Sequence, residues 1–191
     1  MGIHEEILGA VQTALIKALI TDVTYAPEDN KPADTAVAGV VKIGPLQGDP
    51  DPDTARISVE LYDNDPDQTI RRSGTGAAPE SWDDTIYEIE CGGGVTWKRR
   101  FTVKARCLLE ATQEDLEGAR TVASTVRSRI EHALLSLSLS GVSSENEYVS
   151  RGVFSWSMRS EMVQSGGPPS SYDYLIKVRF EVLTSETVGL A

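Results

Sequence analysis

The residues best suited to bind a metal ion lie in a short acidic segment of sequence DPDPD. Asp49, Asp51 and Asp53 stand at the first, third and fifth positions of a calcium loop, and Glu60 falls at the twelfth. The sixth position, where such a loop needs glycine, is Thr54, and two prolines stiffen the segment. Glu60 also lies in a predicted strand. We therefore expect a solvated loop and no bound metal.

The remaining polar residues contain no enzyme motif. Residues 74–79, GTGAAP, resemble part of a dinucleotide-binding fingerprint but do not connect a buried strand to a helix. His4 is expected at a solvated helix start, and His132 has no evident carboxylate or cysteine partner. Cys91 and Cys107 lack CxxC spacing and are expected to be small core residues. The sequence therefore predicts a protein that is not an enzyme and has no cofactor.

A basic stripe in residues 95–107 contrasts with the acidity of the whole chain. Its cations share one face of a predicted strand and are Lys98, Arg100, Lys104 and Arg106. One interpretation is that the stripe contacts an acidic partner, either a neighbouring subunit or DNA phosphate. The other is that Glu88 and Glu90 of the preceding strand pair with it, which explains only the end nearest the turn.

Four further residues are candidates for contact with a partner or with another subunit. They are Trp82, Asp63, Asp65 and Asp67. Trp82 lies between a polar loop and a strand, where it either anchors a small apolar cluster or contacts a partner. The three aspartates belong to a long loop in which we expect solvated side chains, and so long a loop is usually functional or disordered.

Two segments have the periodicity of helices. Apolar residues recur at steps of three and four across residues 112–139, which predicts a long amphipathic helix. Thr112 can cap it, acidic residues occupy its first turn, and Gly141 follows its end. A second stripe predicts an N-terminal helix over residues 3–20. The long helix needs a flat apolar partner, and its neighbouring segments fit that role.

The neighbouring segments have the alternation or the apolar content of strands. They are residues 37–43, 56–62, 85–91, 95–107, 148–163 and 172–183. Three glycines predict a turn at 92–94, and residues 30–54, 63–84 and 164–171 are predicted loops. Residues 184–191 are predicted to form a mobile tail. The order of elements predicts a single α+β domain over residues 1–191, with a mostly antiparallel sheet packed by both helices.

Composition narrows the function classes. The chain has 191 residues, of which 40% are hydrophobic and 25% charged, and its formal net charge is −11. An acidic protein repels DNA as a whole, although DNA can still pass through it. No apolar run reaches the length of a membrane span, and the N-terminal residues do not form a signal peptide. We expect a soluble protein made in the cytoplasm.

In the order, size and acidity of its elements, the chain resembles the tail terminator, or tail-completion, proteins of long-tailed bacteriophages. The segments that carry the resemblance are 3–20, 56–62, 85–107, 112–139 and 148–183. The resemblance implies a structural virion protein that caps the tail tube as a ring, ends tube polymerisation and joins the tail to the head connector. Loops 30–54 and 63–84 are longer than a minimal member would need.

The same resemblance implies partners and a location. The partners are other copies of the chain in a ring of commonly six, the tail tube protein and the head–tail connector protein. DNA would only pass through the lumen, and no membrane is involved. The location would be the tail or neck of the virion, after assembly in the host bacterial cytoplasm. Three alternatives stay open: another neck or head–tail connector component, a calcium- or ligand-binding module, and a nucleic-acid binder that uses the basic stripe.

Overall fold

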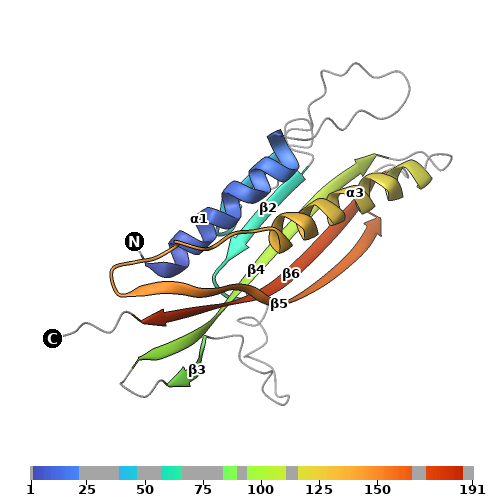
Figure 1. Cartoon of the computed structure of the whole chain (residues 1–191). Helices are drawn as coiled ribbons and strands as arrows, with labels where there is room; N and C mark the ends of the chain where they lie inside the picture. Colours follow the sequence, from blue (N-terminus) through green and yellow to red (C-terminus); the bar gives the residue numbers. More distant parts are fainter. Residues whose placement is uncertain are drawn as a thin grey trace, which may run out of the picture.

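The computed structural model describes residues 2–21, 39–46, 57–65, 84–89, 94–110, 116–164 and 171–186. These residues form two α-helices and six strands (Figure 1). In chain order the elements are α1 (Ile3–Ile16), continued by the π-helical turn Lys17–Thr21, β1 (Gly39–Ile43), β2 (Ile57–Tyr62), β3 (Thr85–Ile89), β4 (Val95–Glu110), α3 (Leu116–Leu135), β5 (Glu147–Gln164) and β6 (Ser171–Glu186).

All six strands belong to one sheet. Its spatial order is β1-β2-β4-β6-β5. β3 pairs with residues 95–98 of β4, beyond the end of β2. β1 and β2 are parallel, and every other pair is antiparallel, so the predicted mostly antiparallel α+β fold is confirmed. The β4–β6 ladder runs from Thr96 opposite Ser185 to Glu110 opposite Ser171. β5 follows β6 over nearly the same length, and the three strands form a long twisted ribbon (Figure 1).

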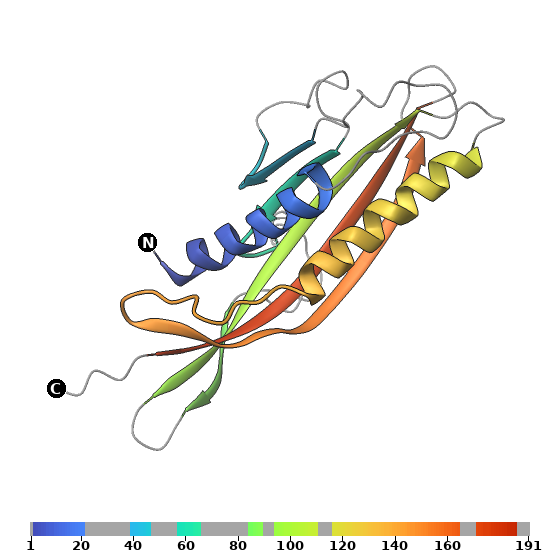
Figure 2. The same ribbon diagram turned by 45° about the horizontal axis from the view of Figure 1, so that its top comes forward.

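Both helices cover the same face of the sheet (Figure 2). Their fully buried side chains follow the predicted stripes and include Ile7, Val11, Leu15, Val126, Ile130 and Leu134. Beneath them, Phe101 of β4 and Phe180 of β6 are stacked, with ring centroids 5.3 Å apart. Each large side chain buried in this layer contributes roughly 1.5–3 kcal/mol before entropy is subtracted. The helix–sheet interface is therefore the core of the molecule, and Cys107 belongs to it as predicted.

The N-terminal helix matches its predicted range, whereas α3 ends earlier than predicted. α1 and its π-helical turn cover the predicted range 3–20, and the N–H of Gly2 donates to the carboxylate of Glu5 at 3.1 Å. α3 ends at Leu135 rather than at residue 139. The Ser136 N–H still donates to the carbonyl of His132 at 2.9 Å, but the Leu137 N–H donates to the carbonyl of Leu134 at 3.4 Å, an i→i−3 bond that replaces the α-helical pattern at the end of the helix. Gly141 adopts φ +88°, the left-handed turn expected of a glycine there. The predicted cap Thr112 lies outside the described residues.

β6 extends further than predicted. Residues 184–186, which the sequence places in a mobile tail, belong to this strand, and Thr184 and Ser185 are buried. The polar composition of residues 184–186 does not indicate a strand, but the hydroxyl groups of Thr184 and Ser185 both have hydrogen-bond partners. Ser185 Oγ lies 2.9 Å from Thr96 Oγ1, and Thr184 Oγ1 bonds Glu147 and Arg99. Buried polar groups are tolerated when they are hydrogen-bonded in this way. Residues 187–191 lie outside the described residues.

The loop predictions 30–54, 63–84 and 164–171 fall largely outside the described residues. In the described part of the chain, no helix is both long and apolar enough to cross a membrane.

Candidate functional site

The basic stripe lies on the sheet face opposite the helices, which we call the far face. On β4 this face carries Lys98, Arg100, Thr102, Lys104 and Arg106, since the alternate residues point into the helix-covered core. The cations pair with acids of the adjacent strand β6. Arg100 Nε lies 3.0 Å from Glu181, Lys98 Nζ lies 3.9 Å from the same carboxylate, and Arg106 makes two bonds of 3.0 Å to Asp173. Lys104 Nζ lies over the ring of Tyr62, 5.8 Å from its centroid.

The predicted pairing of the stripe with β3 is wrong for Glu88. The register sets Glu88 opposite Thr96 and Thr85 opposite Lys98, and Glu88 is exposed. A bulge at Tyr87 causes the difference, because it breaks the alternation of β3 and places Ile86 and Ile89 on one face. Strict alternation along residues 85–91 would place Tyr87 and Ile89 on one face, and the bulge separates them. Glu90 lies outside the described residues.

Asp65 is not the solvated residue that the sequence predicts. Only 2% of its surface is exposed, and its carboxylate accepts hydrogen bonds from Lys177 Nζ at 2.6 Å and from Arg179 Nη2. Lys177 and Arg179 stand two positions apart on β6, so both point to the far face. A buried carboxylate needs such partners, and the chain supplies them here. Asp65 therefore fixes the segment after β2 across the sheet.

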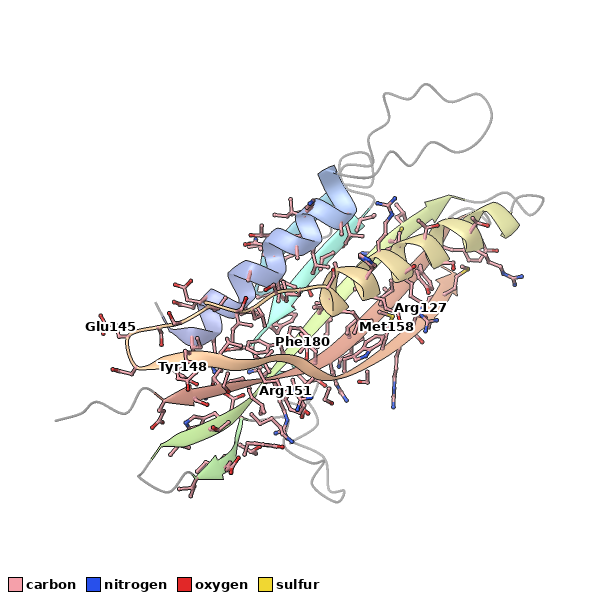
Figure 3. The ribbon with its side chains drawn as sticks, in the orientation of Figure 1. Arg127, Glu145, Tyr148, Arg151, Met158 and Phe180 are labelled. Carbon is pink, nitrogen blue, oxygen red and sulfur yellow. The ribbon has the colours of Figure 1, made fainter. Side chains whose placement is uncertain are left out.

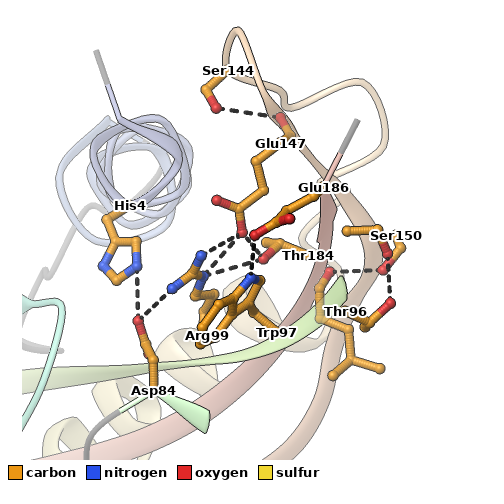
Figure 4. A network of polar contacts seen from close by, with 12 residues as sticks. His4, Asp84, Thr96, Trp97, Arg99, Ser144, Glu147, Ser150, Thr184 and Glu186 are labelled. Carbon is orange, nitrogen blue, oxygen red and sulfur yellow. Dashed lines mark hydrogen bonds and ion pairs between the residues drawn. The ribbon is translucent and has the colours of Figure 1, made fainter. Parts of the chain in front are cut away.

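A second polar network ties together one end of the helix-covered face (Figure 4). Arg99 of β4 is its centre. Its guanidinium lies 3.0 Å from Asp84 and 2.7 Å from Glu147, and its Nε donates to Thr184 Oγ1 at 3.2 Å. Trp97 Nε1 donates to Glu186 at 2.9 Å beside it. The network joins the residue before β3 to β4, to the start of β5 and to the end of β6.

His4 connects this network to α1. Its Nε2 lies 2.9 Å from Asp84, its Nδ1 lies 3.8 Å from Asp63, and its ring centroid is 5.7 Å from that of Phe101. It is thus half-buried between two aspartates rather than solvated. Burial raises the pKa of Asp84, but His4, the guanidinium of Arg99 and the backbone N–H of Arg100 lower it by more, so the pKa of this carboxyl lies below its ordinary value. These contacts connect the start of α1 to the residue that precedes β3 and to the core ring of Phe101.

The β3–β4 hairpin projects beyond the helix layer. β2 pairs with β4 only from Thr102 onward, while β3 pairs with residues 95–98. Every residue of β3 is exposed, including Ile86 (51%), Tyr87 (52%) and Ile89 (68%). Tyr87 meets Phe154 edge-on at 6.3 Å, and Lys98 Nζ lies 5.7 Å from the Tyr87 ring centroid. Sequence reasoning predicted this strand but not its exposure, which depends on where α1 begins.

Several predicted site residues lie outside the described part of the chain, namely Trp82, Asp67, Cys91 and the segment 49–53. Asp63 is exposed near His4. Asp63 lies beside His4, whereas Asp65 lies on the far face, where its partners Lys177 and Arg179 stand opposite Lys104 and Thr102 of β4. Within the described residues, no group of three or more His, Cys, Asp or Glu side chains could hold a metal ion.

No protein-family model matches the sequence, and no curated protein matches it. Among solved structures, the chain is similar to a chain of the virion of a native gene transfer agent (GTA) particle. The two share 10% sequence identity and a TM-score of 0.34, over 90% of this chain and 98% of that one. Because this TM-score is low, the function proposed below rests on the sequence and the geometry of this chain.

Proposed function

We propose that the chain is a structural virion protein of the tail-terminator type. In this role it closes into a ring, caps the tail tube, ends tube polymerisation and joins the tail to the head connector. The observation that carries the proposal is the order of elements around one sheet: a helix, strands, a projecting hairpin, a long helix and two long strands. That order is the one on which the resemblance to tail terminators rests.

The charged residues of the described regions support a structural role over a catalytic one. The His4–Asp84 pair could serve as an acid–base pair, but Arg99 and the backbone of Arg100 also bind Asp84, and Asp63 faces the other imidazole nitrogen. On the far face, Glu181 and Asp173 hold the cations of β4. Ionic contacts between neighbouring strands restrict the movement of one strand relative to another, which suits a ring that carries mechanical load. We propose that the protein is not an enzyme.

The proposal is tested by mixing the purified protein with tail tubes. Light scattering should give a closed ring, commonly of six copies, and negative-stain images should show one ring at a tube end. Tubes assembled with the protein present should stop growing, whereas tubes mixed with heat-denatured protein should not. Protein that stays monomeric at all concentrations and never binds tube ends would contradict the proposal.

Another neck component would share the same body and surfaces, so the position in the particle distinguishes the two roles. Gold labelling of the chain in intact particles should place it at the junction of tail and neck. Label found only on the head side of that junction would favour a head–tail connector component.

A further inference from the structure

The outer edge of β5 is long, regular and open. Residues 155–164 pair with β6 without a bulge, and in the part of the chain that the structure describes no strand lies on their other side. Every second residue of such an edge strand turns its N–H and C=O groups away from the sheet. Natural edges are often protected by proline or by a bulge, and this stretch has neither. The edge can therefore pair with a strand of another chain.

The two faces of this stretch differ in chemistry. Trp156 stands opposite the buried Phe180 and so lies on the helix-covered face. At a period of two, Met158 and Met162 lie on the same face and pack against the core, and Trp156 is still 36% exposed. Arg159 lies on the far face, is exposed, and makes no ion pair with another described residue. A strand added to this edge therefore needs apolar side chains on one face and an acid on the other.

β3 has that pattern, and its outer edge is open as well. Ile86 stands opposite Trp97, so it lies on the side of the sheet that carries the helices, and Ile89 lies on the same side. Both isoleucines are more than half exposed. Glu88 stands opposite Thr96 on the far face, where it is exposed and has no ion pair among the described residues. As far as the structure describes the chain, β3 pairs only with β4.

β3 fits the β5 edge better than the other open edges of the sheet do. β1 carries the exposed Lys42 on its far face, which would place a second cation beside Arg159. Opposite charges across a strand pair stabilise it, whereas like charges destabilise it. A second β5 would use the same edge on both copies, which makes a closed pair and leaves β3 without a partner.

We propose that β3 of one copy adds to the outer edge of β5 in the next copy, antiparallel to it. In this register Glu88 lies beside Arg159 on the far face. Ile89 lies beside Met158 on the other face, and Ile86 follows it there. Backbone hydrogen bonds supply affinity in strand addition of this kind, and the side-chain pairs set the register. One sheet then continues from copy to copy, with its apolar layer and its charged layer both unbroken.

The two strands cannot meet in this way within one copy. β3 pairs with residues 95–98 of β4, beside the last residues of β6, whereas residues 155–164 of β5 pair with the first part of β6. The two segments lie at opposite ends of the sheet (Figures 1 and 2), and Met158 belongs to the half of β5 away from Tyr148 (Figure 3). Each copy thus gives one strand and receives another, a head-to-tail contact that can close a ring.

This inference rests on the proposed ring and identifies the contact that closes it. The first test places cysteines at the paired positions in the full-length protein, in a Cys91→Ser background that removes the thiol near the turn. Side chains directly opposite on paired strands are close enough for a disulfide. Glu88→Cys combined with Arg159→Cys should therefore give a ladder of covalent oligomers under mild oxidation, and a mixture of the two single variants should give dimers only. Neither single variant alone should cross-link, and dimers of Arg159→Cys alone would show β5 paired with β5 and overturn the inference.

The second test uses charge reversal. Glu88→Arg and Arg159→Glu should each raise the dissociation constant of the ring about tenfold at low salt, and the combined variant should recover most of the loss. The single effects should shrink in concentrated salt. Glu145→Arg is the matched control, because Glu145 is an exposed acid outside both strands (Figure 3), and it should change the constant by less than about twofold. A combined variant that assembles no better than the single variants contradicts the proposed pairing.

The third test addresses the apolar face. Ile89→Asp should raise the dissociation constant of the ring at least about tenfold in light scattering across a concentration series. Leu135→Asp is its control, since Leu135 is 55% exposed at the end of α3 and lies outside both strands. It should leave the constant within about twofold, and circular dichroism should show both variants folded.

The outcomes separate this inference from the proposed function. Covalent ladders from chains that form no closed ring support the strand contact and overturn the ring. A ring that survives Ile89→Asp and gives no ladder overturns the strand contact and spares the ring. Rings of Ile89→Asp that stay closed but no longer bind tube ends assign β3 to the tube protein, which also overturns the inference.

Discussion

Replacing Asp65 by Asn should destabilise the fold far more than its place in a polar loop suggests. The carboxylate accepts charge-assisted hydrogen bonds from Lys177 and Arg179 and is itself almost fully buried. Each such bond contributes about 1.5–3 kcal/mol, which sets an upper limit of roughly 3–6 kcal/mol for the pair. The side chains of Lys177 and Arg179 are 24% and 31% exposed, so they regain some water, and Asn keeps one acceptor oxygen. We therefore expect a loss of about 2–3 kcal/mol in the free energy of unfolding.

The assay is urea unfolding followed by circular dichroism, at equal protein concentration and under conditions that hold the chain in one oligomeric state. Asp63→Asn is the matched control, because Asp63 lies two positions earlier in the same segment with its side chain 55% exposed. It should cost at most about 0.5 kcal/mol. The loss at Asp65 should persist in concentrated salt, since buried pairs are screened little. Equal losses for Asp63→Asn and Asp65→Asn would refute the reasoning.

Two further outcomes are expected. Asp84→Asn should cost about 1–3 kcal/mol at pH 7, because it weakens the bonds to His4 and Arg99. Since the folded-state pKa of Asp84 is lowered from 3.8, its contribution is present above about pH 4 and is lost as the pH falls through the lower folded value. The gap between wild type and variant in urea unfolding should therefore close below about pH 4, and a gap that widens there contradicts this account. Ile130→Ala should cost about 2–5 kcal/mol in the same assay, because Ile130 is fully buried in the core, whereas exposed Ser128→Ala should change little.

The buried face of each long strand and of each helix was predictable, because burial follows the local period of the sequence. Phe101 and Ile176 are buried while their neighbours Arg100 and Lys177 face the far side, as alternation requires. The end of α3 was predicted less well, because Leu139 beyond the helix is also buried, so the apolar spacing continues after the backbone hydrogen bonding changes at Leu137.

The contacts of the far face and of the polar network around Arg99 were not predictable, because they join residues distant in the chain. Asp65 and Lys177 are 112 positions apart, and only the strand order β4-β6-β5 brings the acids of β6 beside the cations of β4. The alternation of β4 revealed its cations but not their partners. The bulge at Tyr87 likewise left no signal in the sequence, since any residue can occupy it.

The position of β6 has a consequence for synthesis. It is the last strand of the sheet to leave the ribosome, yet it lies between β4 and β5, which pair with each other only through it. A growing chain therefore holds two long strands with unsatisfied edges until residues 171–186 have emerged. Chains truncated before that point lack the inner strand, so the facing edges of β4 and β5 stay without a partner and the sheet cannot close.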